Sequence, residues 1–151
     1  MQKLLNTFNP WWDDGYTFQV QKRDKYLNRI FQHMDCRDII LLAGLRRVGK
    51  TSIMKLIIGE LISKGFDKTR ILFVSLDDFL FNEKSITDIV AEYRLLHKIR
   101  MEEKIYLFFD EVTYKDKWTQ QLKNLYDKEN VKIIASSSSS SVFIDENAYL
   151  T

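Results

Sequence analysis

The sequence of 151 residues has little of the chemistry on which secreted, zinc-binding or membrane proteins depend. Its single cysteine, Cys36, can form no internal disulfide and no zinc site built from several thiolates, so we expect a cytoplasmic protein in a reducing compartment. The two histidines, His33 and His97, stand alone, and we expect both on helix surfaces rather than at a metal. No apolar run approaches the roughly 18 residues of a membrane span, and the first residues do not form a secretion signal.

An excess of charge of one sign is missing too. The formal net charge is +2, which is too small on its own to indicate binding to nucleic acid. With 45% hydrophobic residues, the chain can bury a single core, and its length predicts one domain.

Residues 44–51 read GLRRVGKT and match the phosphate-binding pattern G-x-x-x-x-G-K-[ST] at every fixed position. In this pattern the glycines let backbone N–H groups surround the phosphates, Lys50 reaches the β- and γ-phosphates, and the Thr51 hydroxyl ligates Mg²⁺. Arg46 and Arg47 either reach phosphate or point into solvent. The residues expected to contact the nucleotide are Gly44, Arg46, Arg47, Val48, Gly49, Lys50, Thr51 and Ser52.

The surroundings of this loop agree with the motif. Residues 39–43 are an apolar run of the kind found in strands buried on both faces. After the loop, apolar residues recur at helical spacing, which predicts a helix over about residues 50–64 with Gly65 at its C-terminal cap. Strand, loop and helix follow one another in the order that phosphate binding requires.

Two adjacent carboxylates, Asp110 and Glu111, end a second expected strand, which starts at Lys104 and continues through the apolar residues 105–109. In a phosphoryl-transfer site the aspartate at such a strand end holds Mg²⁺, and a neighbouring carboxylate acts as general base on water. Asp77 and Asp78 follow another apolar strand and are the alternative bases, although an ordinary turn explains them as well. The metal ligands are therefore expected to be Thr51 and Asp110, with Glu111 as the base.

The remaining pattern predicts alternating strands and helices, and hence an α/β fold with a parallel sheet covered on both faces. Residues 1–19 are expected to form an ordered loop whose tryptophans pack on the domain, and Ser85 to cap a helix together with Asp88. The serine run 136–141 is expected to be ordered at its start and mobile at its end. The other expected elements are a helix over 21–35, strands over 70–76, 104–110 and 131–135, and a helix after Trp118.

Several motifs together resemble the prokaryotic AAA-superfamily P-loop ATPases of the G-x-R-R-V-G-K-T type. The resemblance implies a three-layer P-loop NTPase sandwich with a mainly parallel, AAA-like sheet, in which Lys50 and Thr51 bind phosphate and Mg²⁺ and Glu111 polarises water. It also implies a polar sensor of the γ-phosphate at Ser137 or Ser138, and related folds suggest Arg23 or Tyr26 as an adenine contact. Ser75, near a strand end, could hold Glu111 in an inactive rotamer, although a satisfied core hydroxyl is the plainer explanation of this residue. The motifs that carry it are residues 44–51, Asp77-Asp78, Phe108-Phe109-Asp110-Glu111, Trp118, Ala135-Ser136-Ser137-Ser138 and Asn9-Pro10-Trp11-Trp12.

Chains of this family are longer, so the resemblance places a fifth core strand, a helical lid and an arginine finger outside this sequence. Residues 1–151 are then a single, incomplete ATPase domain on which residues 1–37 pack as an aromatic loop and helix. The expected function is an ATP-binding, Mg²⁺-dependent ATP-hydrolysing module of a switch or motor. The alternatives are a nucleotide-dependent binding module with little hydrolysis and a P-loop kinase acting on a small acceptor. The partners considered are ATP or ADP, a homo-oligomer, and nucleic acid or protein bound through the missing region.

Overall fold

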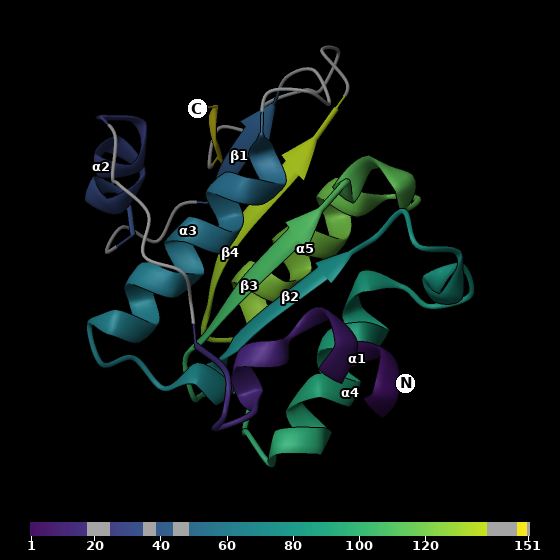
Figure 1. Ribbon diagram of the computed structural model, residues 1–151. Helices are drawn as coiled ribbons and strands as arrows, with labels where there is room; N and C mark the ends of the chain where they lie inside the picture. Colours follow the sequence, from purple (N-terminus) through teal and green to yellow (C-terminus); the bar gives the residue numbers. More distant parts are fainter. Residues whose placement is uncertain (18–24, 35–38, 44–48, 139–147, 151) are drawn as a thin grey trace.

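The computed structural model describes residues 1–17, 25–34, 39–43, 49–138 and 148–150 (Figure 1). Five parallel strands form one sheet in the order β2-β3-β4-β1-β5. The alternating pattern therefore predicted the sheet correctly, and β4 lies in space between β1 and β3. The strands are β1 (Ile39–Ala43), β2 (Ile71–Ser75), β3 (Ile105–Asp110), β4 (Val131–Ser137) and β5 (Ala148–Leu150).

The short strand β5 corrects one expectation. It pairs with β1 from Ile39↔Ala148 to Leu41↔Leu150, so a fifth strand is present within this sequence. The prediction that the fifth strand is missing is wrong because three residues after a serine-rich stretch are too few to show a periodicity. Their pairing depends on β1, which lies far away in sequence.

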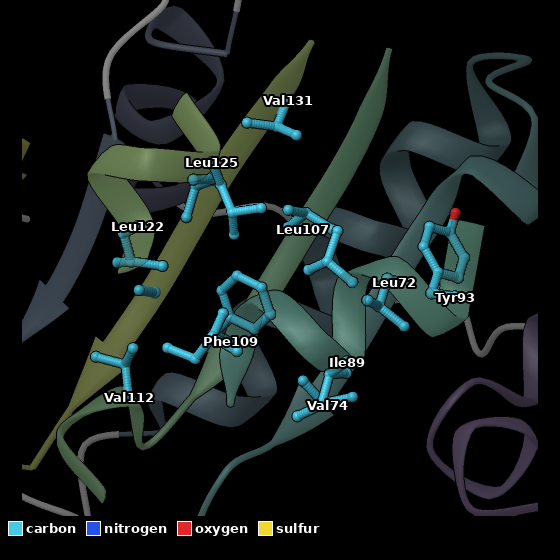
Figure 2. Packing of buried hydrophobic residues seen from close by; sticks show 14 of the residues in the cluster. Leu72, Val74, Ile89, Tyr93, Leu107, Phe109, Val112, Leu122, Leu125 and Val131 are labelled. Atoms are coloured by element: carbon cyan, nitrogen blue, oxygen red, sulfur yellow. The ribbon is translucent and has the colours of Figure 1, made fainter. Parts of the chain in front are cut away.

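Helices cover both faces of the sheet (Figure 1). On one face α2 (Lys25–Gln32) and α3 (Lys50–Ser63) contribute side chains to a core shared with Ile40 and Leu42 of β1. On the other face α4 (Ile86–His97) and α5 (Trp118–Lys128) pack against alternate strand residues, including Leu72, Leu107 and Phe109 (Figure 2). Because β1, β2 and β3 are buried on both faces, each of them reads as a nearly continuous apolar run. None of the described helices is long and apolar enough to cross a membrane.

Local capping signals fix the helix ends that the sequence predicted. Ser85 and Asp88 form a reciprocal capping box at the start of α4. At the end of α3, Gly65 has φ +93°, and the N–H groups of Gly65 and Phe66 donate to the carbonyls of Ile62 and Leu61 at 3.0 and 3.1 Å. This bond pattern is a Schellman motif, and its left-handed residue favours glycine.

The N-terminal segment is more regular than predicted. Instead of a loop, it contains α1 (Gln2–Phe8) and a 3-10 turn, η1 (Pro10–Trp12). A seven-residue helix is too short to show a repeated period, and its stability depends on tertiary packing. Leu5 provides this packing, because its side chain is buried in the core and is 1% exposed. The prediction that the tryptophans pack on the domain is confirmed, because Trp11 is 2% exposed within the α3-side core. The other 3-10 turns are η3 (Lys68–Arg70), η4 (Phe79–Phe81) and η5 (Val112–Tyr114).

Candidate nucleotide site

The carboxyl ends of β1, β3 and β4 meet at one edge of the sheet, where α3 begins (Figure 1). Of the predicted nucleotide contacts, Gly44, Arg46, Arg47 and Val48 lie outside the described residues, as do Arg23 and the side chain of Tyr26. The described part of the phosphate motif begins at Gly49.

Gly49 and Lys50 make the entry into α3. Gly49 has φ +76°, a left-handed conformation that glycine adopts without strain, and a Cβ placed there would meet no atom of the described residues within 4 Å. The glycine is therefore required by its backbone and not by lack of space. Lys50 is the first residue of the helix and is 5% exposed. The first N–H groups of a helix have no acceptor within it and favour anions, so Lys50 and Ser52 stand at a suitable phosphate site.

A direct hydrogen bond joins the two predicted motifs. Thr51 Oγ1 donates to Asp110 Oδ2 at 2.6 Å, although 59 positions separate these residues in sequence. Both side chains supply oxygen atoms, which are the ligands that Mg²⁺ prefers, and Mg²⁺ is commonly held by one or two such groups together with substrate phosphates. The described residues contain no cluster of three or more His, Cys, Asp or Glu side chains arranged for a metal. The donor set therefore fits a magnesium ion that arrives with a nucleotide.

Ser136 is a site residue that the sequence did not reveal. Its hydroxyl donates to Asp110 Oδ1 and accepts the Glu111 backbone N–H at 3.0 Å, and the residue is fully buried. The register between β3 and β4 pairs Phe109 with Ala135, which places Ser136 beside Asp110. The strand pairing identifies Ser136 as the partner of Asp110. The serine run alone does not distinguish Ser136 from Ser137 and Ser138, which were the predicted sensors.

Glu111 leaves the sheet through an unusual backbone conformation. Its φ and ψ are 54° and 51°, in the left-handed region that few non-glycine residues adopt. Ser138 Oγ donates to Glu111 Oε1 at 2.6 Å. Of the two predicted sensors, Ser138 thus contacts the expected base, and the buried Ser137 pairs with Ala43, the last residue before the phosphate loop.

The alternative bases are engaged in local turns. Ser75 Oγ donates to Asp77 Oδ1 at 2.6 Å, so its hydroxyl has a local partner, which agrees with the plainer interpretation of Ser75 and not with a contact to Glu111. Asp78 accepts the Leu80 N–H at 2.9 Å and caps η4. Both carboxylates have the partners of an ordinary turn, which agrees with the plainer of the two interpretations of this pair.

Lys55 adds a partly buried cation one helical turn beyond Thr51. Burial lowers the pKa of Lys55, and the negative charge of Asp110 acts in the opposite direction. The ammonium group lies 4.1 Å from the centre of the Phe73 ring and 5.1 Å from that of Trp11. These rings offer it a cation–π contact in place of water. The i, i+4 spacing from Thr51 is the sequence signal that could have placed Lys55 on this side of α3.

Comparison with known families agrees with this geometry. A sequence model of the AAA domain family matches residues 36–150. The chain belongs to the AAA domain family. This AAA domain is 37% identical to an uncharacterised protein of Methanocaldococcus jannaschii over 125 residues, or 82% of the chain and 25% of that relative. It is 25% identical to an uncharacterised protein of Haemophilus influenzae over 131 residues, or 85% of the chain and 32% of that relative.

Solved structures share the fold of this AAA domain. PCH-2 of C. elegans has a TM-score of 0.50 at 18% identity, over 83% of the chain and 39% of PCH-2. DnaA of Aquifex aeolicus with bound AMPPCP has a TM-score of 0.50 at 17% identity, over 85% of the chain and 43% of DnaA. A replication initiator DnaA bound to AMPPCP and single-stranded DNA has a TM-score of 0.50 at 18% identity, over 81% of this chain and 40% of that DnaA chain. The AAA domain therefore has the α/β fold of a P-loop nucleotide-binding ATPase module, and it spans less than half the length of each of these relatives.

Proposed function

We propose that this AAA domain binds ATP with Mg²⁺ and hydrolyses it to ADP and phosphate. The observation that carries the proposal is the 2.6 Å hydrogen bond between Thr51 and Asp110, which brings the phosphate motif and the carboxylate strand to one point. The bound AMPPCP, an analogue of ATP, in two DnaA structures of the same fold supports ATP as the nucleotide.

Binding is assigned to the start of α3. In the proposal Lys50 neutralises the β- and γ-phosphates, and the N–H groups that follow Gly49 donate to them. Arg46, Arg47 and Val48 are retained as further contacts in the preceding loop. A buried lysine next to a helix N-terminus combines a full charge with the partial positive charge of the helix end, and both favour a polyanion.

Magnesium is assigned to Thr51 and Asp110, whose oxygens fit it. When bound, the ion would supply positive charge that offsets the negative charge of the phosphates. Ser136 keeps the Asp110 carboxylate in one orientation by donating to Oδ1, which leaves Oδ2 directed at Thr51. Because Ser136 is fully buried, bulk water does not compete for this contact.

Hydrolysis is assigned to Glu111 as the general base. Its carboxylate accepts a proton from the attacking water while the water oxygen bonds to the γ-phosphorus and the bond to the β–γ bridging oxygen breaks. Ser138 donates to Oε1, so in this proposal Oε2, for which the described residues show no such bond, receives that proton. Ser137, opposite the last residue before the phosphate loop, is the proposed contact with the γ-phosphate.

The two curated relatives are much longer than this domain, since the chain spans a quarter of one and about a third of the other. We therefore assign the work of a switch or motor to the longer proteins, with this domain supplying the nucleotide site. Assembly into homo-oligomers and contact with a protein or nucleic-acid partner are proposed for those longer proteins too. PCH-2 and DnaA support the fold in this argument and not the partner.

Calorimetric titration with MgATP tests the binding half. Lys50→Ala should weaken binding by about 1.5–3 kcal/mol, the range for hydrogen bonds to charged groups, which is roughly 10- to 150-fold in Kd. Lys123→Ala removes an exposed lysine of α5 and serves as the matched control, which should bind as the wild type does. Equal affinities of the Lys50 and Lys123 variants would refute the phosphate-binding assignment.

Phosphate release under single-turnover conditions tests the hydrolytic half. Glu111→Gln keeps the size and the acceptor oxygen for Ser138 but loses the base, so MgATP should still bind while hydrolysis slows by about 10²–10⁴-fold. Asp77→Asn is the control. The Asp77 carboxylate accepts a hydrogen bond from Ser75, so this substitution should leave the rate of hydrolysis unchanged. If the Asp77 variant alone is slow, the base lies at the end of β2 instead.

A further inference from the structure

Lys115 is a buried lysine that lies four residues after the proposed base Glu111. It is 8% exposed and caps the C-terminal end of the 3-10 turn η5. Its ammonium group donates to the carbonyl of Phe81, the last residue of η4, and no carboxylate of the described residues forms an ion pair with it. Burial lowers the pKa of Lys115. A cation inside a protein is unfavourable without a partner of opposite charge, so packing alone does not account for a lysine at this position.

The bond from Lys115 to Phe81 joins the two segments that follow β2 and β3. A second link lies at the strand ends, where the Leu76 N–H donates to the Asp110 carbonyl at 2.9 Å. Residues 76–81 and residues 110–115 run between these two links. Glu111 therefore lies within a closed circuit of chain, which is fixed at the sheet by a backbone bond and at the far end by the lysine.

The backbone of Glu111 requires such support. Its left-handed conformation is sparsely populated by residues other than glycine and persists where the surrounding structure fixes it. Its N–H donates to Ser136 Oγ at 3.0 Å, and its carbonyl accepts the Tyr114 N–H at 3.2 Å. The next residue, Val112, is fully buried in the core shared with α4 and α5 (Figure 2). Val112 thus anchors the start of η5, and the Lys115 bond anchors its end.

We propose that Lys115 is a positioning residue for Glu111, because its bond to η4 holds η5 in place and so keeps the base directed at the attacking water. The inference rests on the proposed hydrolysis, in which Glu111 accepts a proton from that water. Lys115 acts through the backbone and not through its charge, since its ammonium group is bound to a carbonyl of the neighbouring turn. A displacement of about 1 Å can cost roughly 10²-fold in rate. Binding of the nucleotide, which is assigned to other residues, is unaffected.

Lys115→Met removes the bond while a side chain of similar length and volume fills the same space. The Phe81 carbonyl keeps a partner, because it also accepts the Lys84 N–H at 2.9 Å. The substitution also removes the cost of burying a charge, so the free energy of unfolding by urea should equal or exceed that of the wild type. Lys123→Met makes the same substitution at an exposed position of α5 and is the matched control.

The activity measurements are the Kd of MgATP by calorimetry and the rate of phosphate release in a single turnover at saturating MgATP. Lys115→Met should bind MgATP as the wild type does, while phosphate release slows by roughly 10- to 10²-fold. A lysine that only supported the fold would give the reverse result, with lower stability and an unchanged rate for each folded molecule. Lys123→Met should match the wild type in stability, affinity and rate.

A double-mutant cycle with Glu111→Gln distinguishes failure of this proposal from failure of the proposed function. Since Lys115 acts through Glu111, Lys115→Met should slow the wild type and leave the Glu111→Gln variant at its already reduced rate. Equal slowing in both backgrounds would overturn the positioning role. A slow Glu111→Gln variant together with a Lys115→Met variant at the wild-type rate would overturn it too, while the base assignment stands. Glu111→Gln at the wild-type rate would refute the base itself and the positioning role with it.

Lys115→Leu covers the case in which Lys115→Met does not fold. It loses the same donor and has a side chain of similar volume, so the same affinity, the same slower rate and the same result of the cycle are expected. Phosphate release at the wild-type rate in this variant would also overturn the proposal.

Discussion

The Ser136 hydroxyl connects two neighbouring groups with different tasks. It donates to the proposed magnesium ligand Asp110 and accepts the backbone N–H of the proposed base Glu111. Ser136→Ala removes both bonds inside the core. A buried polar group left without its partner costs about 1–3 kcal/mol, so we expect a loss of that size in the free energy of unfolding by urea.

The same variant should shift the Mg²⁺ dependence of hydrolysis to higher concentration, because Asp110 is no longer held in one orientation. Ser138→Ala is the comparison, since Ser138 contacts Glu111 and not Asp110. That variant should change the rate at saturating Mg²⁺ while the half-saturating concentration stays the same. Identical magnesium curves for wild type and Ser136→Ala would contradict a positioning role.

At the scale of single residues, the sequence names candidates wherever a residue type has one task at a fixed spacing in a motif. Lys50, Thr51, Asp110 and Glu111 were named from the motifs, and the structure brings Thr51 and Asp110 into contact. Ser136 was not predicted, because its contact with Asp110 depends on which strands are neighbours and on the register in which they pair. A run of identical serines carries no signal of its own that distinguishes one hydroxyl from the next.

The helices and strands also fall into two groups: those whose signals are local in sequence and those that depend on partners far away in the chain. The Ser85 capping box and the left-handed Gly65 depend on interactions within a few residues, and the sequence predicted both. The helix α1 and the strand β5 are short and are held by partners far away in the chain, so no local pattern could indicate them. Length and the distance to the partner, more than residue type, separate the two groups.

The contact between α4 and the N-terminal segment gives a prediction about pH. His97, at the end of α4, packs edge-on against Trp12 at 4.3 Å between ring centres, and its Nε2 has no hydrogen-bond partner among the described residues. Burial lowers the pKa of His97 below its usual value, while the negative charge of Asp67 opposes the shift. The folded state therefore favours the neutral ring.

Below about pH 6.5, the usual pKa of histidine, the unfolded chain binds more protons at this position than the folded one. The free energy of unfolding should then fall as pH decreases from 7 towards the lowered pKa, and the contribution of His97 should be complete above that range. His97→Gln should flatten this slope when urea unfolding is measured between pH 5 and 8. A slope unchanged by the substitution would mean that the ring titrates equally in both states.

At the scale of the whole molecule, the proposed nucleotide site joins parts of the chain that lie far apart in sequence. The site takes Lys50 and Thr51 from α3, Asp110 from the end of β3 and Ser136 from β4. The unfolded chain offers no such arrangement, so a ligand bound here binds the folded state alone. Nucleotide should consequently stabilise the entire domain and not only the loop that holds the phosphates.

Thermal unfolding measures that stabilisation. With MgATP at a hundred times its Kd, the gain is about 2.7 kcal/mol, which for a domain of this size raises Tm by roughly 5–11 °C. ATP in the presence of EDTA should give a smaller rise, because Thr51 and Asp110 then hold no cation between themselves and the phosphates. Asp110→Asn should remove the difference between these two conditions while it retains a rise with ATP alone. If Lys50→Ala shows the full increase with MgATP, the nucleotide binds somewhere other than the start of α3.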